Sequence, residues 1–319
     1  MSDGVFRFGL IGAGRMGRTH LRALAGSTTV QVTAVVEPVA EARAAMAETG
    51  RTVFEDVSQL LATGGIDAVL IAAPTPLHIE LVTQVAAAGL PILCEKPCGL
   101  SSAGIREAQE AVDRHGVPFQ VAYWRRYVPA LQALRQQIQR GELGEIHLLA
   151  SSQWDKEPPS AAFRSASGGI FRDMGVHEFD QVRWLSGQDF GEITAVAGPL
   201  GTDPDDTSGD PDSAQAMARL SGGATAFVSL GRYFPGGDMA RVEVFGTRDA
   251  VRSDFLDPKD GEQAQLDALL RQAEGFATFA RGGPQTGASI HDAVAALDAA
   301  ERASTAMERS RASAVGAAS

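Results

Sequence analysis

The N-terminal strand and the glycine-rich turn after it constrain the fold more than any other feature. Residues 5–11, VFRFGLI, are apolar and predict a buried strand, and GAGRMG follows at once with G-x-G-x-x-G spacing. Residues 16–26 then predict a helix. The first glycine permits a tight turn, the second lets a pyrophosphate approach the backbone, and the third lets helix and strand pack closely. The candidate dinucleotide-binding residues of this turn are Gly12, Gly14, Arg15, Met16 and Gly17.

A second apolar run, VQVTAVV, ends in Glu37, twenty residues after Gly17. An acidic residue at this place accepts hydrogen bonds from the adenosine ribose hydroxyls. Its carboxylate would also repel a 2′-phosphate, so NAD is favoured over NADP. Arg43 could reach the area from the next helix, and NADP therefore stays the less favoured alternative.

Strands and helices alternate up to residue 123, which predicts an α/β Rossmann domain with a doubly wound parallel sheet. Ligands of such sheets bind at the carboxyl ends of the strands. Two segments, 73–76 and 95–97, directly follow predicted strands and should face the cofactor. Their candidate residues are Ala73, Thr75, Glu95 and Lys96. His78 could contact the cofactor or could cap or pack its helix, and His20 lies on a predicted helix in a surface or packing role.

Cys94 and Cys98 are the only cysteines. No second Cys or His pair at ligand spacing accompanies them, and their spacing is not C-x-x-C. We therefore expect no metal site. We expect Cys94 to be a buried strand residue and Cys98 a loop residue, both without a redox role.

After Tyr123 the pattern changes. A helix is predicted over 128–144 and strands over 144–154, 193–200, 213–220, 224–234 and 239–246, with Gly222-Gly223 as a hairpin turn. Helices near 263–281 and 290–308 complete the chain. The sequence thus predicts an α+β C-terminal domain with a mainly antiparallel open sheet. The expected ranges are 1–123 for the dinucleotide-binding domain and 124–319 for a substrate-binding and oligomerisation domain.

Charge and hydropathy exclude several classes of partner. The net charge of −11 argues against nucleic acid, which requires clustered Lys and Arg. No apolar run reaches the roughly 18 residues of a membrane span. The N-terminus lacks the features of a signal peptide, and we expect a cytoplasmic protein. The acidic run in TDPDDTSGDPD, residues 202–212, is interpreted as a solvated surface.

The segment SGGIFRDMGVHEFDQVRWLSG, residues 167–187, predicts a helix that carries a catalytic pair. Asp173 and His177 are four residues apart and share one face of this helix. An imidazole can act as a general base near neutral pH. A nearby carboxylate can orient the imidazole and stabilise its charged form. The alternative interpretation is a solvated Asp–His pair on an ordinary helix.

Over essentially its whole length the chain resembles the Gfo/Idh/MocA oxidoreductases. The resemblance rests on GAGRMG, ILCEKP, RRYVPALQALRQQIQRGELGEI and GGIFRDMGVHEFD, and within the family it is strongest to the inositol 2-dehydrogenases. It implies that Lys96, Asp173 and His177 are the catalytic set. It also implies that Arg126 and Asp155 lie near a polyol substrate. The segment RYFPGGDMAR departs from the pattern of an inositol dehydrogenase, with Tyr233 as its nearest tyrosine, which leaves the identity of the polyol open.

We therefore expect an NAD-dependent dehydrogenase that oxidises a secondary hydroxyl of a cyclic polyol, with inositol the first candidate. His177 serves as general base, Asp173 orients it, and Lys96 polarises the alcohol oxygen. Pro97 can adopt a cis bond, which would aim Lys96. We expect a homo-oligomer, a dimer or tetramer, that associates through the C-terminal sheet. The alternatives are a dehydrogenase of another sugar, a non-enzymatic dinucleotide sensor and an NAD-dependent glycosidase.

Overall fold

A computed structural model describes residues 4–200 and 206–317, which form two compact units. The first unit contains residues 4–99, 103–127 and 266–293, and the second contains residues 100–102, 128–200, 206–265 and 294–317. Residues 266–293 thus return to the N-terminal unit. The expected domain ranges, 1–123 and 124–319, stay a prediction.

The first unit is built on a six-stranded parallel sheet in the order β3-β2-β1-β4-β5-β6. Its strands are β1 Phe6–Ile11, β2 Val30–Val36, β3 Thr52–Phe54, β4 Ala68–Ile71, β5 Ile92–Cys94 and β6 Phe119–Val121. The strand order reverses beside β1, which is the feature that opens a ligand crevice at the carboxyl ends of the strands. The predicted doubly wound parallel sheet is confirmed.

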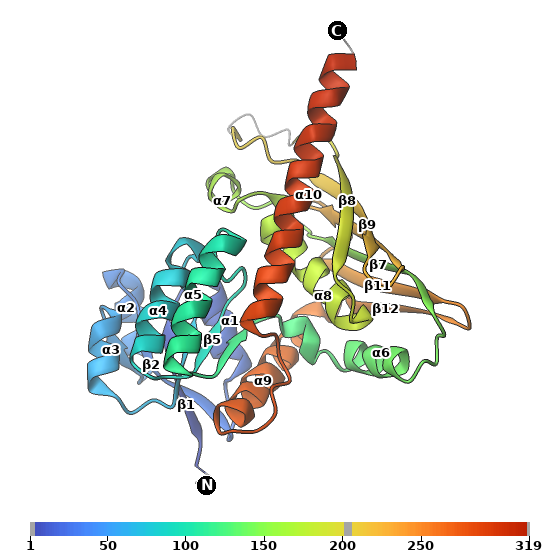
Figure 1. Ribbon diagram of the computed structural model, residues 1–319. Helices are drawn as coiled ribbons and strands as arrows, with labels where there is room; N and C mark the ends of the chain where they lie inside the picture. Colours follow the sequence, from blue (N-terminus) through green and yellow to red (C-terminus); the bar gives the residue numbers. More distant parts are fainter. Residues whose placement is uncertain (1–3, 201–205, 318–319) are drawn as a thin grey trace. The chain divides into compact units, whose positions relative to one another are not determined.

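Helices connect these strands (Figure 1). They are α1 Arg15–Ala23, α2 Ala40–Ala47, α3 Val57–Thr63, α4 His78–Ala87 and α5 Ser102–His115. Because a doubly wound sheet is covered on both faces, its central strands are mostly apolar, and β4 is buried at every residue. The longer helix α9 Gly261–Ala280 adds Phe276, whose ring centroid lies 5.9 Å from that of Phe8 in β1.

The second unit contains a six-stranded mixed sheet in the order β12-β11-β7-β10-β9-β8. Its strands are β7 Ile146–Trp154, β8 Phe190–Ala197, β9 Ser213–Leu220, β10 Thr225–Gly231, β11 Met239–Gly246 and β12 Ala250–Leu256. Only the β7–β10 pair is parallel among the strand pairs of this sheet, so the predicted mainly antiparallel sheet is confirmed. Strand β12 was not anticipated, because its polar sequence AVRSDFL lacks an apolar alternation.

The predicted hairpin at Gly222-Gly223 is confirmed as the connection between β9 and β10. Gly223 has a φ of +95°, a conformation that glycine adopts without steric cost. The pairing that follows places Ala214, Ala216, Ala218 and Leu220 on a buried face of the sheet. The sheet therefore has one apolar inner face.

The second unit also contains helices. They are α6 Pro129–Gln139, α7 Ala161–Ala166, α8 Val176–Ser186 and α10 Ile290–Ala317, whose first residues belong to the first unit. Helix α8 packs on β7 and β10. On the opposite face Met217, Val196 and Phe245 are 57%, 52% and 43% exposed. Near β8, Val196 and Met217 of this face line a cavity together with Ala306, Arg309 and Ser310 of α10.

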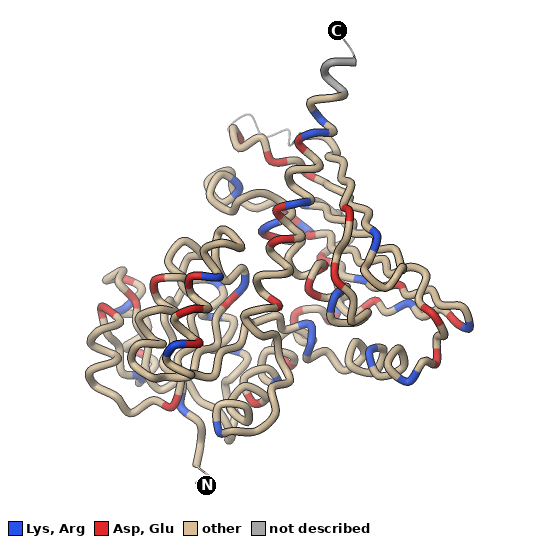
Figure 2. The backbone as a smooth tube through the Cα atoms, in the orientation of Figure 1, with Lys and Arg blue, Asp and Glu red and all other residues tan. Residues whose placement is uncertain are grey.

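Charged residues of both signs are interspersed along both units. Figure 2 shows that Lys and Arg do not gather on one element but alternate with Asp and Glu. None of the described helices has the length and apolar character needed to cross a membrane.

Candidate functional site

The glycine-rich turn between β1 and α1 has the close packing that its sequence predicts. Gly12 has a φ of +94°, and a side chain there would meet the Ala72 carbonyl oxygen at 2.8 Å. A Cβ at Gly17 would collide with the Gly12 carbonyl oxygen. A Cβ at Gly14, by contrast, would have no atom of another part of the chain within 4 Å. Gly12 and Gly17 are therefore required by packing, whereas Gly14 leaves an open space over the backbone.

The turn and the end of β2 together fit a dinucleotide. Helix α1 begins after Gly14 without a side-chain cap and without an acidic residue in its first turn, so its N-terminal N–H groups favour a phosphate. Glu37 is 7% exposed, and its Oε2 accepts a hydrogen bond from the Ala13 N–H at 2.9 Å. Its Oε1 accepts from the Val39 N–H at 3.0 Å. The carboxylate is thus fixed beside the glycine-rich turn, where a ribose would need an acceptor.

Arg43 does reach the end of β2, as the sequence allowed. Its Nη1 donates to the carbonyl oxygens of Glu37 and Pro38 at 2.9 and 2.8 Å. Its Nη2 lies 3.4 Å from a Glu55 carboxylate oxygen. The guanidinium is therefore held by the backbone and by an acid, which keeps the local charge unfavourable for a 2′-phosphate.

The two loops expected to face the cofactor are joined by His78 at the start of α4. Its Nδ1 lies 2.8 Å from the Pro97 carbonyl oxygen and its Nε2 lies 2.8 Å from the Ala73 carbonyl oxygen. Burial lowers the pKa of His78, against the raising effect of the two carbonyls and of Glu95. His78 therefore has the packing role that the sequence allowed. Contact of His78, Ala73 and Thr75 with the cofactor stays a prediction.

Lys96 lies two residues after the end of β5, and its backbone is held by Glu95. The Lys96 N–H donates to Glu95 Oε2 at 3.0 Å, and His20 Nε2 lies 2.7 Å from Glu95 Oε1. Burial raises the pKa of Glu95, but His20 and Lys96 outweigh burial and lower the pKa overall. Because the carboxylate is then ionised, His20 must donate through Nε2. The Lys96–Pro97 peptide bond is cis, as proposed from the sequence.

Both cysteines are free and buried, at 0% and 1% exposure. Burial raises the pKa of the Cys94 thiol, and Cys98 adds to the shift. A thiol with a raised pKa is a poor nucleophile. Within the described residues, no group of three or more His, Cys, Asp or Glu side chains could hold a metal ion.

In the second unit, Asp173 and His177 lie on consecutive helical segments. Asp173 belongs to a π-helical turn, Phe171–Gly175, and His177 belongs to α8, which follows without a break. The predicted single regular helix is therefore corrected, because a π-turn changes the helical register before His177. Such turns occur frequently at functional sites. The side chain of Asp173 is 15% exposed and His177 is 6% exposed.

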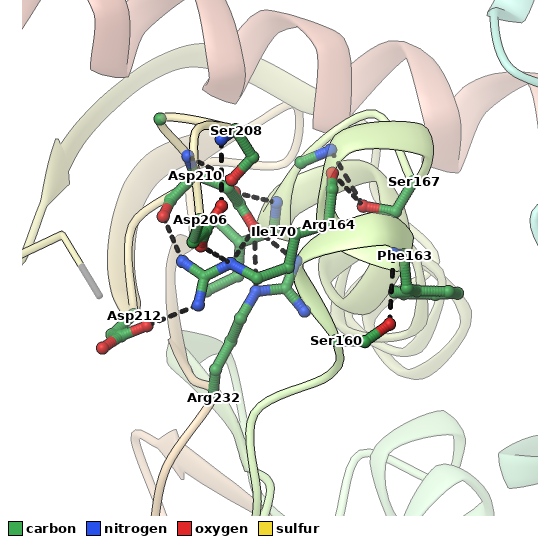
Figure 3. Close-up of polar contacts among 12 residues, drawn as sticks. Ser160, Phe163, Arg164, Ser167, Ile170, Asp206, Ser208, Asp210, Asp212 and Arg232 are labelled. Carbon is green, nitrogen blue, oxygen red and sulfur yellow. Dashed lines mark hydrogen bonds and ion pairs between the residues drawn. The ribbon is translucent and has the colours of Figure 1, made fainter. Parts of the chain in front are cut away.

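The acidic run that was interpreted as a solvated surface is partly buried, which corrects that interpretation. Figure 3 shows Asp206, Asp210 and Asp212 arranged around the guanidinium groups of Arg164 and Arg232. Asp210 is 7% exposed and Arg232 only 1%. The two arginines supply the positive charge that allows these carboxylates to leave water. Asp203 and Asp205 of the same run lie outside the described residues.

The structure brings three of the predicted substrate residues of the second unit to one segment, residues 231–234. Asp155 pairs with it through its backbone, from Asp155 N to Gly231 O at 3.0 Å and from Phe234 N to Asp155 O at 2.7 Å. Arg232 Nη1 lies 3.2 Å from Asp173 Oδ2. Tyr233, at the centre of the segment, is 56% exposed.

Arg126 has a partner within the first unit. Its two terminal nitrogens lie 3.4 and 3.3 Å from the carboxylate oxygens of Asp292. Burial raises the pKa of Asp292, but Arg126 and Ser289 outweigh it and lower the pKa overall. Arg126 is 6% exposed, so its guanidinium is oriented before any substrate binds.

Two buried partners of the candidate site, His20 and Arg232, were not predicted as site residues, although the sequence holds a signal for each. His20 is three residues after Gly17, so it lies on the same helix face that packs on the sheet. Arg232 continues the inward alternation of Ala226, Val228 and Leu230 in β10. A charged residue at an inward position requires a buried partner.

The difference between Gly14 and Gly17 gives the first prediction. Gly17→Ala should destabilise the fold by about 3 kcal/mol or more, because its Cβ meets backbone. Gly14→Val should leave the unfolding temperature near that of the wild type and should weaken NAD binding, because the added side chain occupies open space at the phosphate position. Thermal unfolding and NAD titration measure both. Equal stability of the two variants would contradict this account of the turn.

The buried pair of His20 and Glu95 gives the second prediction. His20→Gln retains an N–H donor near the Nε2 position, whereas His20→Leu has a similar volume and no donor. His20→Leu should destabilise the fold by about 3 kcal/mol, because it leaves a buried carboxylate without its donor. His20→Gln should lose much less folding stability, because the carboxylate keeps a donor.

Urea unfolding at several pH values tests the pair. The pKa of Glu95 is lowered in the folded chain, so the pair stabilises the fold at neutral pH and loses this contribution as the pH falls through that pKa. The difference between wild type and His20→Leu should therefore shrink in acid. A difference that does not depend on pH would show that packing alone accounts for the loss.

Comparisons with known proteins agree with this geometry. Residues 6–123 match a family model described as an oxidoreductase family with an NAD-binding Rossmann fold, and residues 131–252 match the GFO/IDH/MocA C-terminal domain. The chain is 46% identical over 304 residues to the rhizopine catabolism protein MocA of Rhizobium meliloti, which covers 95% of this chain and 96% of that protein.

Two further similarities extend over nearly the whole chain. The inositol 2-dehydrogenase of Rhizobium meliloti strain 1021 is 31% identical, over 93% of this chain and 95% of its own length. The apo crystal structure of a scyllo-inositol dehydrogenase from Lactobacillus casei superposes with a TM-score of 0.88 at 25% identity, covering 97% of this chain and 98% of that one. The chain therefore belongs to the Gfo/Idh/MocA family of oxidoreductases, with an NAD-binding Rossmann fold.

Proposed function

We propose that this oxidoreductase uses NAD to oxidise a secondary hydroxyl of a cyclic polyol, with inositol or an inositol derivative as substrate. The observation that carries the proposal is the position of Lys96 two residues after the end of β5, at the carboxyl end of a strand in the dinucleotide-binding sheet. Ligands of doubly wound sheets bind at this end. The second unit adds an imidazole and a carboxylate, His177 and Asp173, on one continuous helical stretch.

His177 serves as the general base of the proposed reaction. It removes the proton from the substrate hydroxyl while hydride leaves the carbon that bears it. An imidazole is suited to this step because it titrates near the working pH. Asp173 orients the ring and stabilises the imidazolium that forms.

Lys96 serves as the electrophilic partner. Its ammonium donates hydrogen bonds to the alcohol oxygen and stabilises the negative charge that develops before the carbonyl forms. The contact from its own backbone N–H to Glu95 fixes the turn from which the side chain extends. When bound, NAD accepts the hydride at its nicotinamide ring.

The preference for NAD over NADP is part of the proposal. Glu37 offers a fixed carboxylate beside the glycine-rich turn, where it would accept hydrogen bonds from the ribose and repel a 2′-phosphate. Arg43 donates to two backbone carbonyls, and we propose that it does not recruit the phosphate.

The substrate class is supported by the relatives of the chain. One similar protein is named inositol 2-dehydrogenase, and a more similar one is named for rhizopine catabolism. The higher identity to the second protein supports the alternative, which is a dehydrogenase of another sugar or sugar derivative. Tyr233, which lies in the segment that departs from the inositol dehydrogenase pattern, and Asp155, whose backbone pairs with Gly231 and Phe234, are proposed as substrate contacts along with Arg126.

Association into a homo-oligomer, a dimer or tetramer, also stays a prediction. The open face of the second unit's sheet exposes three apolar side chains, Val196, Met217 and Phe245, and such a patch is typical of a contact surface. We propose that this face joins two copies of the chain.

Glu37→Ser gives the third prediction, which concerns the cofactor. The substitution should narrow the preference for NAD over NADP about 10- to 100-fold, because it removes both the ribose acceptor and the charge that repels the 2′-phosphate. The ratio of kcat/KM for the two cofactors measures this. A wild-type enzyme that uses NADP at least as well as NAD would overturn the interpretation of Glu37.

The fourth prediction concerns the reaction and its base. With NAD present, NADH should accumulate on addition of at least one compound from a panel of inositols, hexoses and sugar acids, and His177→Ala should lower this rate about 10²- to 10⁴-fold. NAD affinity should change little, because the glycine-rich turn belongs to the first unit. Absorbance of NADH and NAD titration measure the two quantities.

A double mutant provides the control for this prediction. Lys96→Ala should also lower the rate, and because both residues serve one proton transfer, the double variant should be less impaired than the product of the single effects. Binding of NAD without net NADH formation from any compound in the panel would instead favour a dinucleotide sensor or an NAD-dependent glycosidase. Wild-type turnover by His177→Ala would require a different base.

A further inference from the structure

Two buried arginines connect the loop 206–212 to the helical stretch that carries Asp173. Arg232 follows β10 and is 1% exposed, and the side chain of Arg164 in α7 is 4% exposed. Figure 3 shows their guanidinium groups close together among the carboxylates of the loop. The two arginines differ in one contact: Arg164 forms ion pairs with carboxylates of the loop, whereas Arg232 also contacts Asp173.

Arg232 is held mainly by Asp210. Its Nε lies 2.8 Å and its Nη2 lies 2.6 Å from Asp210 Oδ2, and its Nη1 lies 3.2 Å from Asp173 Oδ2. A guanidinium has five N–H donors in a rigid fork, so it can hold two carboxylates at once. Its position is therefore set by Asp210, and the third contact is directed at Asp173.

Asp210 is itself fixed from several sides. Its Oδ1 accepts from the Ile170 N–H at 2.8 Å, and its carbonyl oxygen accepts from Arg164 Nη2. Arg164 in turn lies 2.7 Å from Asp206 Oδ2 through its Nε and 2.7 Å from Asp212 Oδ1 through its Nη1. The orientation of Arg232 thus has support that does not depend on Asp173.

Charged groups of both signs surround Asp173. The helical stretch itself adds Arg172, His177, Glu178 and Asp180. The neighbouring elements of the second unit add Arg164, Arg232, Asp155, Asp206, Asp210 and Asp212, and Arg135 of α6 donates to the Trp184 carbonyl at the far end of α8. Among these groups, Arg232 places its Nη1 3.2 Å from the Asp173 carboxylate.

We propose that Arg232 is a positioning residue of the proposed reaction, which holds the Asp173 carboxylate and offsets its charge so that Asp173 orients His177 without retaining a proton on it. This inference rests on the proposed function. A general base must be unprotonated when the substrate arrives, and a carboxylate with its full charge beside an imidazole favours the protonated ring. An arginine that shares the carboxylate moderates this effect and also fixes the rotamer.

Arg232→Met and Arg164→Met form a matched pair for the test. Each removes one buried arginine from the same network, and each leaves buried carboxylates without a cation, so both should lower the unfolding temperature. The readout that separates them is the pH dependence of kcat/KM for polyol oxidation. In Arg232→Met the charge of Asp173 is no longer offset and stabilises the imidazolium, so the rising limb should move to higher pH by about one unit.

Arg164→Met should leave the rising limb where it is in the wild type. At a pH below the shifted limb, kcat/KM of Arg232→Met should fall about 10-fold. A second substitution identifies the route. In an Asp173→Asn background, Arg232→Met should produce no further shift, because the charge through which Arg232 acts is absent.

Each outcome decides the inference. A pH profile of Arg232→Met that matches that of Arg164→Met overturns the inference. It is also overturned if Arg232→Met moves the rising limb of kcat/KM as far in the Asp173→Asn background as in the wild type. If Arg232→Met does not fold, Arg232→Lys and Arg164→Lys carry the test, because lysine keeps the charge without the fork: kcat should fall only in the first, and equal kcat values overturn the inference. Wild-type turnover by His177→Ala would instead show that the proposed function is wrong.

Discussion

The close approach of α1 to the end of β1, which requires glycine at position 17, is the constraint on which the first unit depends. It brings the helix N-terminus to the turn where a pyrophosphate would bind. It also brings the next helical position on that face, His20, into the interior beside Glu95. Glu95 in turn holds the backbone of Lys96. The close packing at Gly17 thus positions the helix N-terminus where a phosphate would bind. Through the buried pair of His20 and Glu95, it also positions the turn that carries Lys96.

In the second unit, Asp173 and His177 lie on one continuous helical stretch, where their side chains are 15% and 6% exposed. A buried carboxylate is costly without a partner, and the Asp173 carboxylate contacts a cation from another segment of the chain. Arg232 supplies that cation at an inward position after β10, and its own cost is offset by Asp210. The loop 206–212 is therefore part of the support of the proposed catalytic residues.

Much of this organisation was predictable from the sequence because it depends on local patterns. The glycine spacing, the acid at the end of β2 and the alternation of strands and helices each predict their own structure, and Lys96 follows a strand in the same way. The burial of the acidic run was not predictable by these means, because its partners Arg164 and Arg232 are distant in sequence. The π-turn at Asp173 and the polar strand β12 were missed for a related reason, since contacts outside the segment set both.

Direct transfer of hydrogen tests the central claim of the account most closely. The enzyme is incubated with NAD and with inositol that carries deuterium on its ring carbons, and the reduced cofactor and the product are analysed by mass spectrometry. We predict one deuterium on each NADH formed and one equivalent of the corresponding ketone. NAD binding without deuterated NADH, for inositol and for the derivatives that the relatives suggest, would contradict the dehydrogenase assignment.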